Sequence, residues 1–245
     1  MIKMVRIDNF GPLASLEWPS LGGLNLVLGE NGAGKTFLLK AVYSVVRSLE
    51  TFALGDERQS SFTEILARKL YWTFQPDRIG DLVTKGSDNP LSFEALVDDN
   101  KVSFSFGRDT AKQITKAHYE GPPLEGNSVF IPAKEVLSLH HLILKSREVD
   151  QLFGFDDTYF DLAKVLNISP TRGKNFPEFA DSRRRLRELL GGRMEYDETD
   201  RRWYFKKGNE KYALGIIAEG VKKLAILDTL LGNRYLSPQS VVFID

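Results

Sequence analysis

The chain has 245 residues, of which 42% are hydrophobic and 27% are charged, and it contains no cysteine. This composition provides enough apolar side chains for a buried core, and it excludes disulfides, thiolate metal sites and cysteine nucleophiles. The 33 basic and 33 acidic side chains balance to a net charge of zero, so the chain as a whole does not attract nucleic acid or an anionic membrane. The sequence shows no secretion signal and no run of about 18 apolar residues. We therefore expect a cytoplasmic protein without a membrane partner.

The N-terminal part of the chain alternates apolar and polar residues. Residues 4–7 predict a first strand, a turn at residues 9–12 reverses the chain, and residues 16–18 predict a second strand. The apolar run 24–28 predicts a further strand that leads directly into a glycine-rich loop. After the loop, apolar residues between positions 38 and 49 recur at helical spacing. The expected order is strand, loop, helix.

The middle of the chain adds a helix and a second hairpin. Apolar residues at 65–70 fall on one helical face, and two alternating runs at 93–97 and 102–106 surround a polar turn at 98–101. Residues 129–131 predict another strand.

A helical lobe is predicted from Glu135 to Leu190, with a break at residues 167–177. In its last helix, Leu186, Leu189 and Leu190 are expected to share one face. Beyond it, residues 194–196 and 203–205 predict a hairpin, and they precede a helix at 221–231 and a strand at 241–244.

The segment that precedes the first helix matches the phosphate-binding pattern G-x-x-x-x-G-K-[ST]. It consists of Gly29, Glu30, Asn31, Gly32, Ala33, Gly34, Lys35 and Thr36. In this pattern backbone N–H groups surround the β-phosphate, the lysine contacts the β- and γ-phosphate oxygens, and the hydroxyl binds Mg²⁺. The glycine spacing does not fit G-x-G-x-x-G, which disfavours a dinucleotide site of the Rossmann type. We therefore predict ATP and Mg²⁺ as cofactors, with Lys35 as the catalytic residue and Thr36 as a metal ligand.

A phosphate-binding loop needs a second acidic group near the metal, at the end of an apolar strand. Asp245 follows the apolar run 241–244 and is the candidate for this role. An ordinary strand end would account for the run alone, but the loop at 29–36 favours the metal role.

Together, the loop 29–36, the long insertion after it, the segment 217–224 and the strand that ends in Asp245 resemble the prokaryotic ABC-type AAA ATPases. This group includes the ATPases of Septu and retron antiphage systems, the OLD family, RecF and SMC-like heads. The resemblance extends over nearly the whole chain. It implies an α/β P-loop NTPase fold of the ABC/SMC-head type. In this fold a mixed sheet surrounds the P-loop helix, beside an antiparallel hairpin layer and a helical lobe.

The same resemblance implies a division of the chain and a mode of assembly. The core lobe would comprise about residues 1–134 and 193–245, and the inserted helical lobe about residues 135–192. Two heads of such proteins enclose ATP between them, so the expected assembly is a homodimer or higher oligomer. The signature loop that contacts the γ-phosphate of the other head corresponds to Ala218, Glu219 and Gly220.

The sequence departs from the family pattern in three places. Ala218 replaces the common serine of the signature loop, and Glu135 stands where transporters have a glutamine. The chain stops at Asp245, where family members continue with a glutamate that orients the attacking water and with a histidine. We therefore expect a truncated product. The three histidines at 118, 140 and 141 do not match the family histidine and are expected on the surface or in the lobe.

The implied function is an ATPase head that dimerises around Mg-ATP and switches an effector, such as a nuclease, in antiphage defence or DNA metabolism. The alternative is a nucleotide-binding sensor or subunit with little or no hydrolysis, because the glutamate is absent. A transporter domain is disfavoured by the signature loop.

Nucleic acid is a further candidate partner, because basic residues gather in one part of the sequence. They are Arg183, Arg184, Arg185, Arg187, Arg201, Arg202, Lys206 and Lys207. A solvated helix face explains them better, and alternation in a hairpin explains Trp203 and Tyr204 without base stacking.

Overall fold

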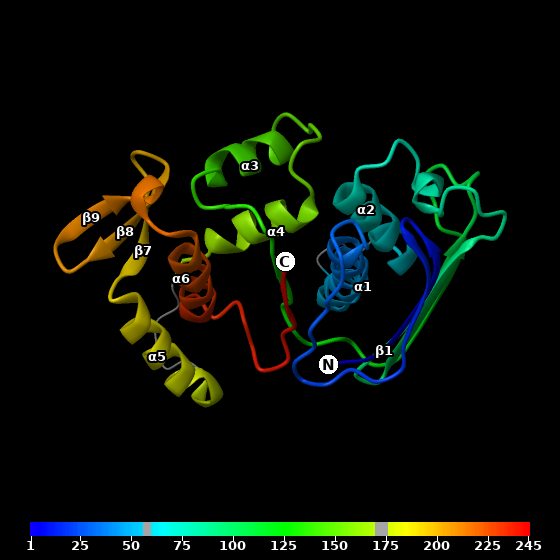
Figure 1. Cartoon of the computed structure of the whole chain (residues 1–245), viewed down its shortest axis with the longest axis horizontal. Helices are drawn as coiled ribbons and strands as arrows, with labels where there is room; N and C mark the ends of the chain where they lie inside the picture. Colours follow the sequence, from blue (N-terminus) through cyan, green and yellow to red (C-terminus); the bar gives the residue numbers. More distant parts are fainter. Residues whose placement is uncertain (56–59, 170–175) are drawn as a thin grey trace. The chain divides into compact units, whose positions relative to one another are not determined.

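The computed structural model describes residues 1–55, 60–169 and 176–245. The chain has a mixed α/β architecture and divides into two compact units, Met1–Ser128 and Val129–Asp245 (Figure 1). Residues 193–245 therefore group with the helices that precede them, whereas the lobe expected from the sequence joined them to the N-terminal residues. The predicted break at 167–177 lies mostly outside the described residues.

The first unit is built on a five-stranded sheet of order β2-β1-β3-β4-β5, antiparallel throughout (Figure 1). The strands are β1 (Ile2–Phe10), β2 (Leu13–Trp18), β3 (Leu91–Val97), β4 (Asn100–Phe106) and β5 (Lys116–Glu120). Neighbouring residues of a strand point to opposite faces, and apolar side chains such as Val5, Ile7 and Phe93 are buried on one face. Both hairpins predicted for this part of the chain are confirmed.

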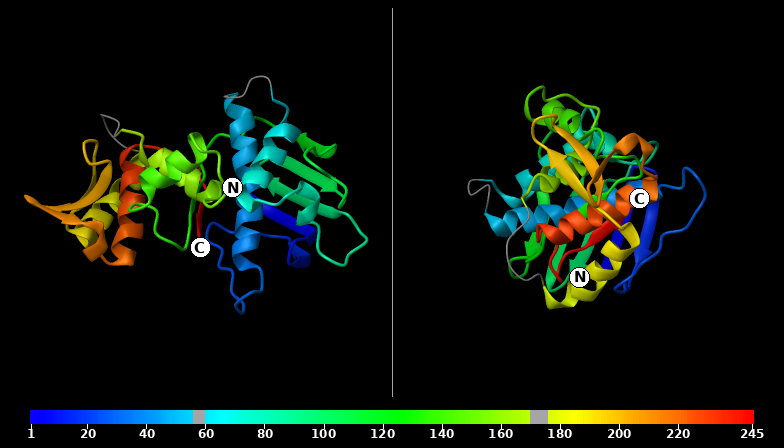
Figure 2. Two further views of the ribbon diagram at one scale, coloured as in Figure 1. Left: turned by 90° about the horizontal axis from the view of Figure 1, so that it is seen from above. Right: turned by 90° about the vertical axis from the view of Figure 1, so that its left-hand side faces the viewer.

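The buried face of this sheet packs against two helices, α1 (Lys35–Leu54) and α2 (Phe62–Phe74), which lie beside each other (Figure 2). A short 3₁₀ helix, η1 (Ile79–Leu82), follows α2. The ring of Phe10 on β1 lies 5.1 Å from Phe37 of α1 and 5.5 Å from Phe74 of α2. The helices predicted from apolar spacing at 38–49 and 65–70 are therefore confirmed.

The strand predicted just before the glycine-rich loop is wrong. Residues 24–28 form no strand, and the side chains of Leu24, Leu26 and Leu28 are 94%, 78% and 81% exposed. A strand needs a neighbour that pairs with its N–H and C=O groups, and no strand of the described chain pairs with this segment. The sheet that packs against α1 is antiparallel and not mixed as expected.

The described part of the second unit contains four α-helices and two small sheets. The helices are α3 (His140–Glu148), α4 (Asp157–Leu166), α5 (Ala180–Leu190) and α6 (Glu219–Gly232), with short 3₁₀ turns η2 (Pro177–Phe179) and η3 (Leu214–Ile216). The strands β6 (Val129–Ile131) and β10 (Val242–Ile244) pair in parallel, and β7 (Arg193–Asp197), β8 (Arg202–Lys207) and β9 (Glu210–Ala213) form an antiparallel sheet. The strands and helices predicted for this region are confirmed.

The core of the second unit gathers apolar side chains from these helices and strands, including Ile143, Leu162 and Trp203. One detail of the prediction for α5 is wrong. Leu190 is buried and Leu186 packs beside it, but Leu189 is 76% exposed. Leu186 and Leu190 are four residues apart and lie on the same side of the helix, and Leu189 is turned away from it.

None of the described helices combines the length and the apolar character that a membrane span requires.

Candidate functional site

The glycine-rich loop adopts a conformation that depends on its glycines. Gly32 and Gly34 have φ angles of 83° and 90°, in the left-handed region that residues with a Cβ rarely adopt. Gly34 is the N-cap of α1, which begins at Lys35. The loop therefore ends where the first N–H groups of a helix lack intrahelical acceptors and can meet an anion.

The lysine of the motif folds back over this loop. Its Nζ donates hydrogen bonds to the carbonyl oxygens of Gly29 and Glu30, each at 2.7 Å, and the N–H of Ala33 donates to the same Glu30 oxygen at 3.2 Å. The ammonium of Lys35 thus lies at the loop that the motif predicts to surround a phosphate. Residues 29–33 and Thr36 are exposed to solvent.

The turn between β1 and β2 supports the loop. A Cβ on Gly34 would lie 3.0 Å from Leu13 Cδ2 and 3.2 Å from Pro12 Cγ. The turn is fixed in its own place, because the N–H of Gly11 donates to Leu82 O at 2.7 Å and the Thr84 hydroxyl donates to Gly11 O at 2.8 Å. These supporting residues could not be predicted from the sequence, since they lie before and far after the motif and carry no motif of their own.

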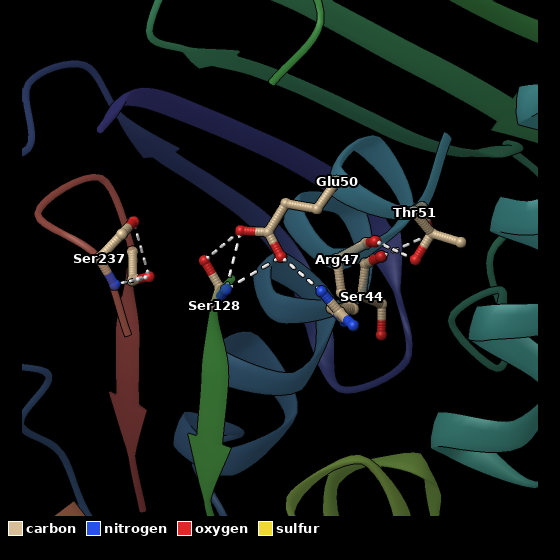
Figure 3. Close-up of polar contacts among 8 residues, drawn as sticks. Ser44, Arg47, Glu50, Thr51, Ser128 and Ser237 are labelled. Atoms are coloured by element: carbon tan, nitrogen blue, oxygen red, sulfur yellow. Dashed lines mark hydrogen bonds and ion pairs between the residues drawn. The ribbon is translucent and has the colours of Figure 1, made fainter. Parts of the chain in front are cut away.

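A buried carboxylate lies farther along the same helix (Figure 3). Glu50 is 1% exposed and accepts hydrogen bonds from the backbone N–H of Ser128 at 2.9 and 3.0 Å and from its hydroxyl at 2.7 Å. Arg47 donates to the same carboxylate at 3.0 Å. These hydrogen bonds tie α1 to Ser128, the last residue of the first unit. The signal missed in the sequence is an acidic residue at an inward position of an amphipathic helix.

In the second unit, Asp245 follows β10. Its N–H donates to Ile131 O on β6 at 3.0 Å, and Lys223 Nζ of α6 donates to the carbonyl oxygen of Asp245 at 3.1 Å. Burial raises the pKa of Tyr159, and the negative charges of Asp156 and Asp245 add to this rise. The predicted aspartate is therefore held between the β6 strand and the α6 helix.

The predicted signature residues lie at the start of α6. Ala218 is the N-cap and offers no side-chain hydrogen bond, as its methyl side chain dictates. Glu219 pairs with Lys222 at 3.5 Å, and all three residues 218–220 are exposed. Glu135 and Lys222 line one cavity with Glu219, but its volume of about 10 Å³ leaves room for little more than a water molecule.

The described residues contain no group of three or more histidine, cysteine, aspartate or glutamate side chains placed to hold a metal ion. The predicted metal ligands, Thr36 and Asp245, belong to the first and the second unit respectively. Thr36 lies in the first turn of α1 and is exposed. A metal at this position would be held by few protein ligands and by phosphate oxygens, which is the usual coordination of Mg²⁺ at nucleotides.

The histidines fit structural positions. His118 lies exposed on β5 and pairs with Glu120 at 3.5 Å. His140 is buried, with Nε2 2.9 Å from Ala163 O, and burial lowers its pKa.

Ion pairs involve three of the arginines of α5. Arg183 and Arg187 each bind Asp228 at 3.2 Å, and Arg184 binds Asp181 at 2.7 Å. Trp203 and Tyr204 lie on β8, where Trp203 is buried, so neither residue needs base stacking to explain it.

The comparisons with known proteins leave the family open. No protein-family model matches the chain. An uncharacterized protein of Methanocaldococcus jannaschii, MJECL10, is 32% identical over 89 residues, which cover 36% of this chain and 37% of that protein. The chain thus matches well under two thirds of this relative's length.

Proposed function

We propose that the chain binds ATP with Mg²⁺ at residues 29–36. The observation that carries the proposal is the position of Lys35. It is the first residue of α1, follows a left-handed glycine N-cap, and holds its ammonium against the loop carbonyls of Gly29 and Glu30. A loop of this sequence and conformation presents backbone N–H groups, a helix N-terminus and a point charge to one phosphate.

Binding would exchange one set of contacts for another. The ammonium of Lys35 would leave the carbonyl oxygens of Gly29 and Glu30 for the β- and γ-phosphate oxygens, a charge-assisted contact that is stronger than a neutral one. The hydroxyl of Thr36 would take one position around Mg²⁺, and the ion would neutralise phosphate charge. Asp245 is the proposed second acidic group near the metal, on the basis of the apolar strand that it follows.

The finer assignment is an ATPase head of the ABC/SMC type that dimerises around Mg-ATP, with Ala218, Glu219 and Gly220 as the loop that meets the γ-phosphate. It would switch an effector such as a nuclease, in antiphage defence or DNA metabolism, in the cytoplasm. The resemblance of the motifs and their order supports this assignment. The alternative is a nucleotide-binding sensor or subunit with little or no hydrolysis.

The proposed role of Thr36 as a Mg²⁺ ligand can be tested through ATP binding. ATP affinity is measured by calorimetry with and without Mg²⁺, for the wild-type chain and for Thr36→Val, which removes the hydroxyl and preserves the shape of the side chain. We expect Mg²⁺ to tighten ATP binding to the wild type, and this gain to shrink at least threefold in the variant. A wild type that binds no ATP would refute the proposed function. Phosphate release in the same samples separates an ATPase from a sensor.

A further inference from the structure

A second cavity lies in the first unit, apart from the glycine-rich loop. It has a volume of about 430 Å³ and lies between one face of α2 and the segment 112–115 that leads into β5. No residue of the loop 29–36 lines it. The volume falls within the range of small-molecule sites, about 300–1,000 Å³.

Both walls of this cavity are anchored. The N–H groups of Ile79 and Gly80 donate to the carbonyl oxygens of Ala111 and Thr110, at 3.1 and 2.8 Å, so the segment before residue 112 is fixed to η1. The opposite wall, α2, packs along α1 and has a complete capping box at its start. The space between the walls is therefore a preformed feature of the unit.

The floor of the cavity is apolar and its rim is charged. Ala67, Ile79 and Ile114 line it and are only 4%, 1% and 3% exposed, so their side chains are part of the packed core. The exposed side chains of Arg68 and Lys112 lie on opposite walls and bring two positive charges. Such a combination suits a ligand with an apolar body and an acidic group.

The acidic residue on the rim has a structural role. Glu64 Oε2 accepts hydrogen bonds from the N–H of Ser61 at 2.7 Å and from its hydroxyl at 3.0 Å, which completes the capping box of α2. Among the described residues that line the cavity, the charged ones are Arg68, Lys112 and Glu64.

We propose that this cavity binds a small molecule that combines an apolar body with one acidic group. The apolar body lies against Ala67 and Ile114, and the acidic group meets Arg68 and Lys112. The site is independent of nucleotide binding at residues 29–36, so a failure of that function would leave this proposal intact.

Matched pairs of probes test the proposal. Indole-3-acetate and naphthalene-2-carboxylate are titrated by calorimetry against the full chain, each beside its neutral amide. We expect the acids to bind and the amides to bind at least tenfold more weakly, since only the acids carry the charge that the rim recognises. The double variant Arg68→Gln/Lys112→Gln should weaken the acids by at least tenfold.

The control variant is Lys116→Gln, which removes the same charge four residues beyond Lys112 from an exposed position that does not line the cavity. It should bind both acids like the wild type. Thermal melts confirm that each variant is folded, since all three substituted positions are exposed. Failure of both acids to bind, equal binding of acid and amide, or unchanged binding in the double variant overturns the proposal.

Discussion

At the scale of single residues, the glycine-rich loop depends on Gly34 for two separate reasons. Its φ of 90° is unfavourable for any residue with a Cβ, and a Cβ there would crowd Pro12 and Leu13, at 3.2 and 3.0 Å. Gly32 shares the first constraint, with a φ of 83°, but no atom lies within 4 Å of a Cβ built there. A comparison of substitutions at the two positions therefore distinguishes the effect of backbone strain from that of steric crowding.

Gly34→Ala should destabilise the chain by about 2 kcal/mol or more, and Gly32→Ala by about 1 kcal/mol, because only the former adds a clash to the backbone strain. Urea unfolding of the two variants and the wild type measures the difference. Equal losses for both variants would show that the contacts of Pro12 and Leu13 with residue 34 are not tight.

The stability of the chain should also depend on Glu50, because its buried carboxylate accepts hydrogen bonds from Ser128 and Arg47. In Glu50→Gln an amide group replaces one acceptor oxygen, so a donor would face the N–H of Ser128 or the guanidinium of Arg47. We expect a loss of about 2–3 kcal/mol in the free energy of unfolding. The matched change at an exposed position, Glu17→Gln, should stay within about 0.5 kcal/mol. A similar small effect at both positions would contradict the network in Figure 3.

At the scale of elements, the sequence predicted most strands and helices because their patterns are local. The hairpin of β3 and β4 shows in two alternating runs and a polar turn, and α1 shows in its apolar spacing. The apolar run 24–28 also predicted a strand, yet it forms none. An apolar run does not show that a neighbouring strand is present to pair with its N–H and C=O groups.

The exposure of segment 24–28 can be tested by substitution. Leu26→Ser should change the free energy of unfolding by less than about 0.5 kcal/mol, because the side chain of Leu26 has little packing to lose. Leu91→Ala on β3, where the leucine is fully buried, should cost about 2–5 kcal/mol. Chemical denaturation of both variants provides the comparison. A cost of more than about 1 kcal/mol for Leu26→Ser would mean that this leucine is packed in the folded chain.

Helix α3 carries a group that links stability to pH. Burial lowers the pKa of His140 below its usual 6.5, and Nδ1 is buried with no hydrogen-bond partner, so protonation would add a donor without an acceptor. Below about pH 6.5 the unfolded chain binds this proton more readily than the folded chain, and the free energy of unfolding should fall as the pH falls. His140→Gln should reduce this loss between about pH 7 and pH 5, measured by urea unfolding. The exposed control His118→Gln should retain it, and an unchanged slope in His140→Gln would refute the assignment.

At the scale of the whole molecule, the two units differ in how much of the candidate site the sequence could predict. The loop 29–36 is contiguous, so its motif is visible in the sequence alone, and the structure shows two left-handed glycines in it and a helix that begins at Lys35. The support from Gly11, Pro12 and Leu13 depends on contacts between separate parts of the chain, which no local pattern encodes. Asp245 was predicted from a short apolar run, and in the structure it follows β10 directly. Its role at the metal remains a proposal.

The central claim is that residues 29–36 bind ATP through Lys35. The most direct measurement is a calorimetric titration of ATP, with Mg²⁺ present, into the wild type, Lys35→Ala and Lys85→Ala. Lys85 is exposed in the same unit and lies outside the loop, so its variant removes the same charge without touching the site. We predict equal affinity for the wild type and Lys85→Ala, and at least tenfold weaker binding, about 1.4 kcal/mol, for Lys35→Ala. Wild-type protein that binds no ATP, or equal affinity in all three proteins, would contradict the claim.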